Sequence, residues 1–386
     1  MDLQVVLVLL VVSSLLACHN GVEGGTGLSE KEYLELEKQL ELLNKPAVKT
    51  IHSDHGDIID CVDFYKQPAF DHPLLKNHTF LYQVKPNSLP RRKRDQVESK
   101  STKPINIGLR GEGCPVGTVP IRRITIADLI RGRLTSKTKS LQDFGPGTHY
   151  AVLRTTSSST KFGGAGAYMS LHNPYSGPGQ YTAARVKLQN GVDSIEVGWR
   201  VDQSLYGDRN TRLFINFNDG QYHCFNTICP GFVIVRSDIP IDGVFDHVSV
   251  PGQEPVAFQA YIDRDEANGN WWLLLGNNLT EVGFWPKAIF TGLGDLANYV
   301  DWGGEAFSPP GTYIPAMGRG TFPKEDPRLD AFFTRVSVID EYGKTVNVDN
   351  AEEFADNPDL YRVQDLGYKG DYYGRAFVYG GPGGIA

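Results

Sequence analysis

From His149 onward, the chain consists of short apolar runs separated by turn-forming residues, and this pattern limits the fold more than any other feature. The runs are rich in Val, Ile, Tyr, Phe and Thr, which favour extended backbone, while Gly, Pro, Asn and Asp cluster between them. Such spacing is typical of an antiparallel β-sandwich of short strands, here jelly-roll-like. We therefore predict an all-β domain over residues 148–386, with strands in His149–Arg154, Ala167–His172, Tyr181–Leu188, Thr211–Phe217, Gly231–Arg236, Val256–Asp263 and Trp271–Leu275.

The chain before this domain has a different character and is predicted to be a small mixed, partly helical pro-segment over residues 25–147. Ser29 and Glu32 form a capping box, and apolar residues follow at helical spacing until Pro46 ends the helix. Charge also changes between the two parts. From Thr148 onward there are 18 Lys+Arg and 28 Asp+Glu, whereas residues 1–147 carry a small positive net charge. Opposite charges suit a segment that binds the acidic domain and inhibits it.

Two further segments predict export and processing. Residues 3–16 form an apolar run of the length of a signal-peptide core, so we expect residues 1–24 to be a signal peptide. A bacterial lipoprotein box ending at Cys18 is the alternative. No later apolar run approaches the roughly 20 residues of a membrane helix, which predicts no membrane association. The basic run at 91–94 predicts a cut at Arg94, within a wider window of 91–147, although a solvated basic loop would have the same composition.

Four cysteines remain once the signal peptide is removed, an even number that suits an oxidising compartment. Cys224 and Cys229 are close in sequence and form a natural local pair, which leaves Cys61 for Cys114. Three pairings are open, and we favour this one. Zinc-ligand clusters are absent from the sequence, which predicts no metal and no cofactor.

The sequence also bears on partners and modification. No basic patch is interleaved with aromatic residues, so we predict no nucleic-acid partner. Asn77 and Asn278 begin acceptor sequons for N-linked glycans, Asn-His-Thr and Asn-Leu-Thr.

The candidate chemistry is reduced to carboxylates because the common peptidase motifs are absent. There is no Gly-x-Ser-x-Gly elbow, no Asp-[Ser/Thr]-Gly pair and no His-Glu-x-x-His. Glu196 and Glu305 lie in apolar strand-like stretches, where alternation places each glutamate on the face opposite its apolar neighbours. An exposed strand glutamate is the commoner case. Here glycines adjoin both residues, which predicts open space beside the two carboxylates and partial desolvation of each.

Motifs along nearly the whole chain resemble those of the neprosin family of secreted plant proteins. The segment resembling the family's activation peptide is Cys61-Val-Asp-Phe-Tyr-Lys-Gln-Pro-Ala-Phe-Asp-His-Pro, continued by Gly113-Cys-Pro-Val-Gly-Thr-Val-Pro-Ile-Arg-Arg123. The motifs of the β-domain are Glu196-Val-Gly-Trp-Arg-Val, Leu205-Tyr-Gly-Asp, Thr211-Arg-Leu-Phe, Cys224-Phe-Asn through Cys229-Pro-Gly-Phe-Val, Gly269-Asn-Trp-Trp-Leu, Gly283-Phe-Trp-Pro, Trp302-Gly-Gly-Glu305, Met317-Gly-Arg-Gly-Thr-Phe-Pro323 and Tyr379-Gly-Gly-Pro-Gly-Gly384.

The resemblance implies a glutamic endopeptidase that is made as a zymogen and cleaves after proline, on a seven-stranded antiparallel β-sandwich. Its two catalytic glutamates fall on Glu196 and Glu305, and its disulfide pattern agrees with the pairing favoured above. The predicted partners are proline-containing peptides and the chain's own propeptide, and the predicted state is a monomer. We expect secretion to the cell wall or apoplast, with the vacuole as the alternative. A substrate groove is predicted at Trp199, Tyr206 and Trp302.

Two close carboxylates cannot both ionise cheaply, so we expect the pair to share one proton and to work at acidic pH. One glutamate would activate a water as general base, and the other would carry the proton. Two rival functions remain open from the sequence. A two-carboxylate glycoside hydrolase would need the same residue types. A non-enzymatic cell-wall or carbohydrate-binding sandwich would keep the motifs without turnover.

Overall fold

The computed structural model describes residues 29–89, 108–109, 111, 113–136, 147–156 and 159–385. It divides into a small unit that ends at Glu41 and a large unit from Leu42 onward. In the small unit, the predicted capping box is confirmed at the start of helix α2 (Glu30–Leu43). Ser29 Oγ accepts from the Glu32 backbone N–H at 3.4 Å, and Glu32 Oε2 accepts from the Ser29 backbone N–H at 2.8 Å. None of the described helices has the length and apolar content that a membrane crossing requires.

The large unit begins with a three-stranded antiparallel sheet that belongs to the predicted pro-segment. Its strands β1 (Ala47–His52), β2 (Ile58–Asp63) and β3 (Thr118–Arg122) pair in that order. The Cys61–Cys114 disulfide joins β2 to the chain just before β3. Short 3-10 turns follow β2, and helix α3 (Ile126–Ser136) follows β3.

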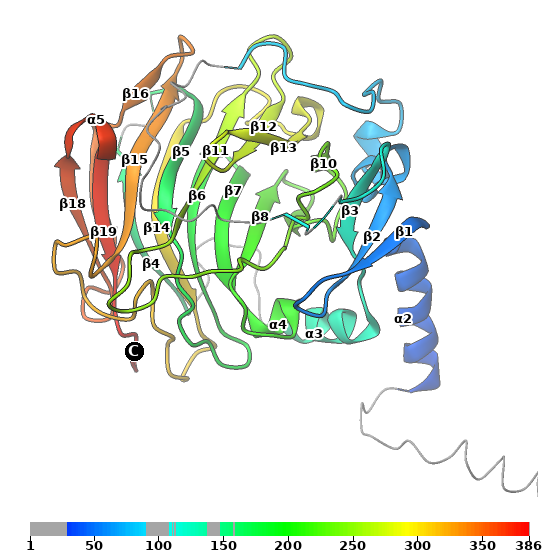
Figure 1. Cartoon of the computed structure of the whole chain (residues 1–386), viewed down its shortest axis with the longest axis horizontal. Coiled ribbons are helices and arrows are strands. Elements are labelled where there is room, and N and C mark those ends of the chain that lie inside the picture. Colours follow the sequence, from blue (N-terminus) through cyan, green and yellow to red (C-terminus); the bar gives the residue numbers. More distant parts are fainter. Residues whose placement is uncertain are drawn as a thin grey trace, which may run out of the picture. The chain divides into compact units, whose positions relative to one another are not determined.

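Two large antiparallel sheets form the rest of the unit and confirm the predicted β-sandwich (Figure 1). The resemblance implied seven strands, but this number fits only one of the two sheets. That sheet has the order β17 (Ala351–Ala355), β4 (Thr148–Thr155), β14 (Tyr299–Phe307), β6 (Tyr181–Asn190), β7 (Asp193–Val201), β8 (Arg212–Asn218) and β9 (His223–Phe225).

The other sheet has nine strands. Its order is β10 (Val233–Ile234), β13 (Thr280–Trp285), β12 (Trp271–Leu275), β11 (Ala257–Arg264), β5 (Phe162–Ser170), β15 (Ala331–Asp340), β19 (Arg375–Gly380) and β18 (Arg362–Tyr368), with β16 (Thr345–Asn347) paired to β15. The predicted strand at 231–236 is reduced to the two residues of β10.

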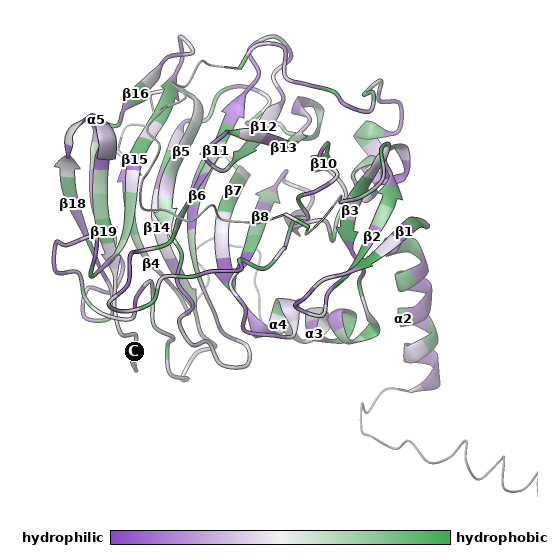
Figure 2. Cartoon of the chain, viewed as in Figure 1, coloured by the Kyte–Doolittle hydropathy of each residue, from purple (hydrophilic) through white to green (hydrophobic). Residues whose placement is uncertain are grey.

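The core lies between the two sheets, and hydrophobic residues are interspersed with hydrophilic ones along the strands (Figure 2). On β7 the core-facing residues are Ile195, Val197, Trp199 and Val201, and all are fully buried. The indole N–H of Trp199 donates to the Ser170 carbonyl of β5 at 2.8 Å, which links the two sheets. The alternate residues of β7, Glu196 among them, therefore point away from this core.

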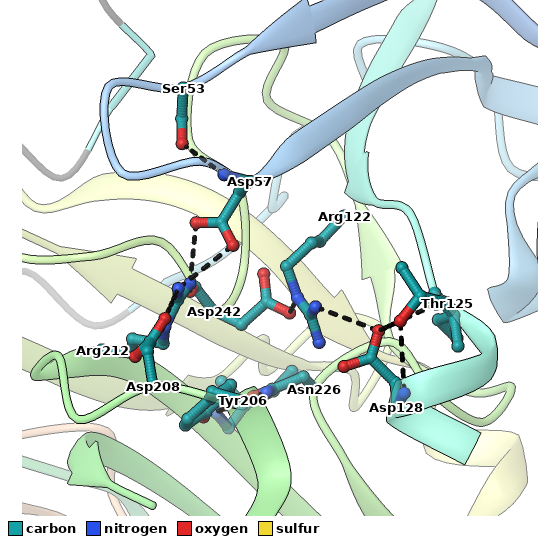
Figure 3. Close-up of polar contacts among 12 residues, drawn as sticks. Ser53, Asp57, Arg122, Thr125, Asp128, Tyr206, Asp208, Arg212, Asn226 and Asp242 are labelled. Carbon is teal, nitrogen blue, oxygen red and sulfur yellow. Dashed lines mark hydrogen bonds and ion pairs between the residues drawn. The ribbon is translucent and has the colours of Figure 1, made fainter. Parts of the chain in front are cut away.

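A buried network of ion pairs joins the pro-segment to one edge of the sandwich (Figure 3). Its centre is Arg212 of β8, whose side chain is 1% exposed. Arg212 donates to both oxygens of Asp57, in the β1–β2 turn, at 2.8 and 3.1 Å, and also to Asp208 at 2.5 Å. Beside it, Arg122 of β3 donates through Nε to Asp242 at 2.8 Å. Two arginines thus connect the pro-segment to the sandwich.

Candidate active site

The sheet register brings Glu196 and Glu305 to the same face. Strand β6 lies between β7 and β14, and it pairs Lys187 with Glu196 and Ala183 with Glu305. Residues 183 and 187 are separated by an even number, so they share a face of β6 and their partners share it too. The two carboxylates therefore lie on neighbouring sides of one strand, pointing away from the core.

Arg185, halfway between these two positions on β6, contacts both carboxylates. Its Nε atom lies 3.1 Å from Glu305 Oε2 and 3.7 Å from Glu196 Oε2. Its Nη1 atom donates to Asp301 Oδ1 of β14. The Arg185 side chain is 2% exposed, and those of Glu196 and Glu305 are 6% and 12% exposed. The two glutamates thus form a dyad that has little exposure to solvent and is bridged by one guanidinium.

The glycines beside the dyad have a different role from the one predicted. Gly198 and Gly303 lie opposite Arg185 on either side of β6, so the arginine occupies this part of the face. A Cβ atom at Gly198 would lie 1.9 Å from the Ala184 carbonyl oxygen, and one at Gly303 would lie 2.3 Å from that of Ala151. The prediction of open space was wrong, because these glycines permit close strand approach next to a large side chain.

Glu305 contacts two groups that stabilise a carboxylate anion. The Tyr181 hydroxyl donates to Glu305 Oε1, and Arg185 donates to Oε2. Burial raises the pKa of Glu305, but Arg185, the Tyr181 hydrogen bond and nearby Arg200 outweigh it, so the pKa is lowered from its usual value. Glu305 is therefore favoured as an ion at acidic pH.

Tyr181 is itself held by two ring contacts. The Arg200 guanidinium carbon lies 3.4 Å from the centre of its ring, and Phe307 stacks on it at 5.5 Å. Arg200 is held by Asp202 through two hydrogen bonds of 3.0 and 2.7 Å. These contacts aim the hydroxyl at Glu305.

Glu196 has polar neighbours of its own. Lys187 Nζ lies 3.6 Å from its Oε1, and Asn216 Nδ2 lies 3.5 Å from its Oε2. A cavity of about 270 Å³ opens on the same face beside Arg185 and Lys187. It is lined mainly from β4, β6 and β14, by Tyr150, Val152, Arg154, Arg185, Lys187, Gln189, Gly191, Asn298, Tyr299, Asp301 and Phe354.

The three predicted groove residues are elsewhere, and that prediction was wrong. Trp199 and Trp302 are fully buried in the sandwich core, on the opposite face from the glutamates. Tyr206, on α4 (Gln203–Tyr206), is 5% exposed and lies beside the Arg212 network in Figure 3. Its hydroxyl accepts a hydrogen bond from Asn226 at 3.2 Å.

The remaining predicted sites are located as follows. The structure contains both favoured disulfides, Cys61–Cys114 and Cys224–Cys229. The sequon residues Asn77 and Asn278 are exposed. Arg94 and the signal peptide lie outside the described residues. Within the described part of the chain, no cluster of His, Cys, Asp or Glu could hold a metal ion.

Sequence reasoning missed Arg185, Tyr181 and Asp301 as parts of the site. One signal could have found Arg185. The turn at Gly191 and Val192 joins β6 to β7 through two residues, with Gly191 at φ +65°, and it pairs Asn190 with Asp193. Counting back along this hairpin places Lys187 opposite Glu196. Arg185 then lies two residues further along β6, on the same face as Lys187.

Comparison with known proteins gives two family matches. A family model described as Neprosin matches residues 178–382, and one described as Neprosin activation peptide matches residues 50–163. Among solved structures, a Scytalido-glutamic peptidase with a peptide-based transition state analog matches at 13% identity and a TM-score of 0.34. SCP-B, a member of the eqolisin family of peptidases in complex with the tripeptide Ala-Ile-His, matches at 12% identity and a TM-score of 0.31. Both matches cover 61% of this chain and 97% of the other.

Proposed function

We propose, from the premise that this chain belongs to the neprosin family and carries that family's activation peptide, that it is a secreted glutamic endopeptidase made as a zymogen. We further propose that it hydrolyses peptide bonds on the C-terminal side of proline at acidic pH. The observation that supports this most is the pair of mostly buried glutamates, 6% and 12% exposed, that Arg185 bridges. Two carboxylates at one site, in different surroundings, are the arrangement that acid–base hydrolysis needs.

In the proposed reaction, Glu305 is the ionised glutamate and removes a proton from the attacking water. Its contacts with Tyr181 and Arg185 favour the anion. Glu196 carries the proton, polarises the scissile carbonyl and then protonates the leaving amine. Activity should disappear at higher pH, once both carboxylates are ionised and no proton donor remains.

A matched pair of peptides tests the substrate class. One peptide contains a single proline, and the other has alanine at that position. We expect acidified enzyme to cleave the first after proline and to leave the second largely intact. Equal cleavage of both would reject the proline preference, and hydrolysis of a glycan substrate instead of either peptide would reject the peptidase.

The pro-segment is proposed to act as inhibitor until it is cut, and the disulfide makes a specific prediction about this step. Cys61 and Cys114 lie on either side of the basic run at 91–94. A cut at Arg94 alone should therefore leave the two fragments covalently joined. We expect one band on a non-reducing gel and two on a reducing gel. Two separate fragments without reductant would contradict the tether.

Release of the segment then needs a second cut beyond Cys114, for which Pro115, Pro120 and Pro146 are candidates in sequence. Pro120 lies inside β3, buried and paired with Cys61, so it is protected while this sheet is folded. Pro115 is exposed. Pro146 lies outside the described residues. Of the two described prolines, Pro115 is the accessible one.

A further inference from the structure

The proposed dyad contains a positive charge that a pair of proton-sharing carboxylates does not require. Two carboxylates at close range repel each other, and this repulsion alone would keep one of them protonated to high pH. Here Arg185 Nε lies 3.1 Å from one carboxylate and 3.7 Å from the other, in surroundings that exclude most water. A cation at this place weakens the repulsion and favours ionisation of both groups.

We propose that Arg185 is the positioning residue of the dyad and that, with Asp301 as its counter-charge, it sets the pH range in which the enzyme works. This inference rests on the proposed function. Arginine suits the task because its planar fork presents separate N–H groups to separate partners. Nε faces the glutamates, while Nη1 is anchored on Asp301, which also accepts from the Tyr299 hydroxyl at 2.9 Å.

Other charged and titratable groups also face the dyad, and they remain when Arg185 is replaced. On β6, Lys187 lies 3.6 Å from Glu196, and the Tyr181 hydroxyl donates to Glu305. Arg200 of β7 helps to lower the Glu305 pKa. Tyr150 of β4 pairs in register with Glu305, and burial followed by the Glu305 charge raises its pKa, so it is neutral at working pH. Arg185 carries a positive charge next to both glutamates, with Nε 3.1 Å from Glu305 and 3.7 Å from Glu196.

The sign of the expected change follows from charge. The active dyad holds one proton. Activity is therefore lost at low pH, where the dyad gains a second proton, and at high pH, where it loses its only proton. Arg185 lowers the pH at which each event occurs. Removing its charge should move both limits to higher pH. Neutralising Asp301 should free the Arg185 charge to act on the dyad and move both limits to lower pH.

The test compares pH profiles of kcat/KM for activated wild-type enzyme and for Arg185→Met, Arg185→Lys and Asp301→Asn. We expect both pH limits of activity to rise by roughly one pH unit or more in Arg185→Met. In Asp301→Asn both pH limits should fall. Arg185→Lys keeps the charge and should keep its limits near wild type, even where turnover falls. Opposite directions for the two charge-removing variants cannot result from simple loss of packing.

Three outcomes separate the two hypotheses. Full activity in Glu196→Gln or Glu305→Gln would reject the proposed function. Inactive glutamine variants combined with unmoved pH limits in both Arg185→Met and Asp301→Asn would reject the role of Arg185 alone. If Arg185→Met fails to fold or to turn over, Asp301→Asn still decides, because a shift to higher pH or no shift would overturn the proposal.

Discussion

Glutamine in place of Glu305 should lower turnover by about 10²- to 10⁴-fold, the usual contribution of a positioned acid or base. The substitution keeps the shape of the side chain and can still accept the Tyr181 hydrogen bond, but it cannot take a proton from water. The carboxylate is only 12% exposed and is held by Tyr181 and Arg185, so the substitution leaves the attacking water without the base proposed for it. Glu196→Gln should show a loss of similar size.

The measurement is kcat on a proline-containing peptide after activation. Glu353→Gln on β17, in the same sheet, serves as the matched control because this glutamate is exposed and lies on a strand that β4 separates from β14. Its activity should equal wild type. Thermal unfolding should be recorded for all variants, so that turnover is compared only among variants that are folded to the same extent. Near-wild-type turnover in Glu305→Gln would remove this residue from the mechanism.

The second large effect concerns stability. Arg212→Met should destabilise the zymogen by about 1.5–3 kcal/mol, because the hydrogen bonds of a buried guanidinium to two partly buried carboxylates are lost. Asp57 and Asp208 would both lose an ion pair, and the Asp242 carbonyl would lose the hydrogen bond that Arg212 donates at 3.0 Å. Because Asp57 belongs to the pro-segment, the substitution should also loosen that segment from the sandwich.

Urea unfolding of the purified zymogen would measure the change. Arg236→Met is the matched control, since Arg236 pairs with Asp238 at 2.7 Å but both side chains are about 40% exposed. An exposed pair of this kind contributes at most about 1 kcal/mol. Equal losses of stability in Arg212→Met and Arg236→Met would show that the Arg212 ion pairs stabilise the zymogen no more than an exposed pair does.

The sequence predicted the features that depend on local pattern. The alternation around Glu196 and Glu305 correctly placed each side chain away from the core, because the direction of a strand residue is fixed by its immediate neighbours. The all-β fold followed from the spacing of apolar runs and turns. The capping box at Ser29 is also a local signal, spread over only four residues.

The sequence failed where the outcome depends on distant strands. Arg185 meets Glu305 only because β6 pairs with β14, more than a hundred residues later, and nothing local to either strand fixes that register. The groove prediction failed for a simpler reason. Trp199 and Trp302 are an odd number of positions from the glutamates in their strands, and the same alternation that orients the glutamates sends these tryptophans into the core.

The proposal of a glutamic post-proline peptidase is tested most directly by mapping cleavage sites. Purified zymogen is acidified and incubated with a mixture of proteome-derived peptides, and the new termini are identified by mass spectrometry, with Glu196→Gln and Glu305→Gln treated in parallel. We predict that new termini follow proline in the wild-type sample and that both variants produce almost none. Absence of proline at the cut sites, or the same cuts in the glutamine variants, would contradict the proposal.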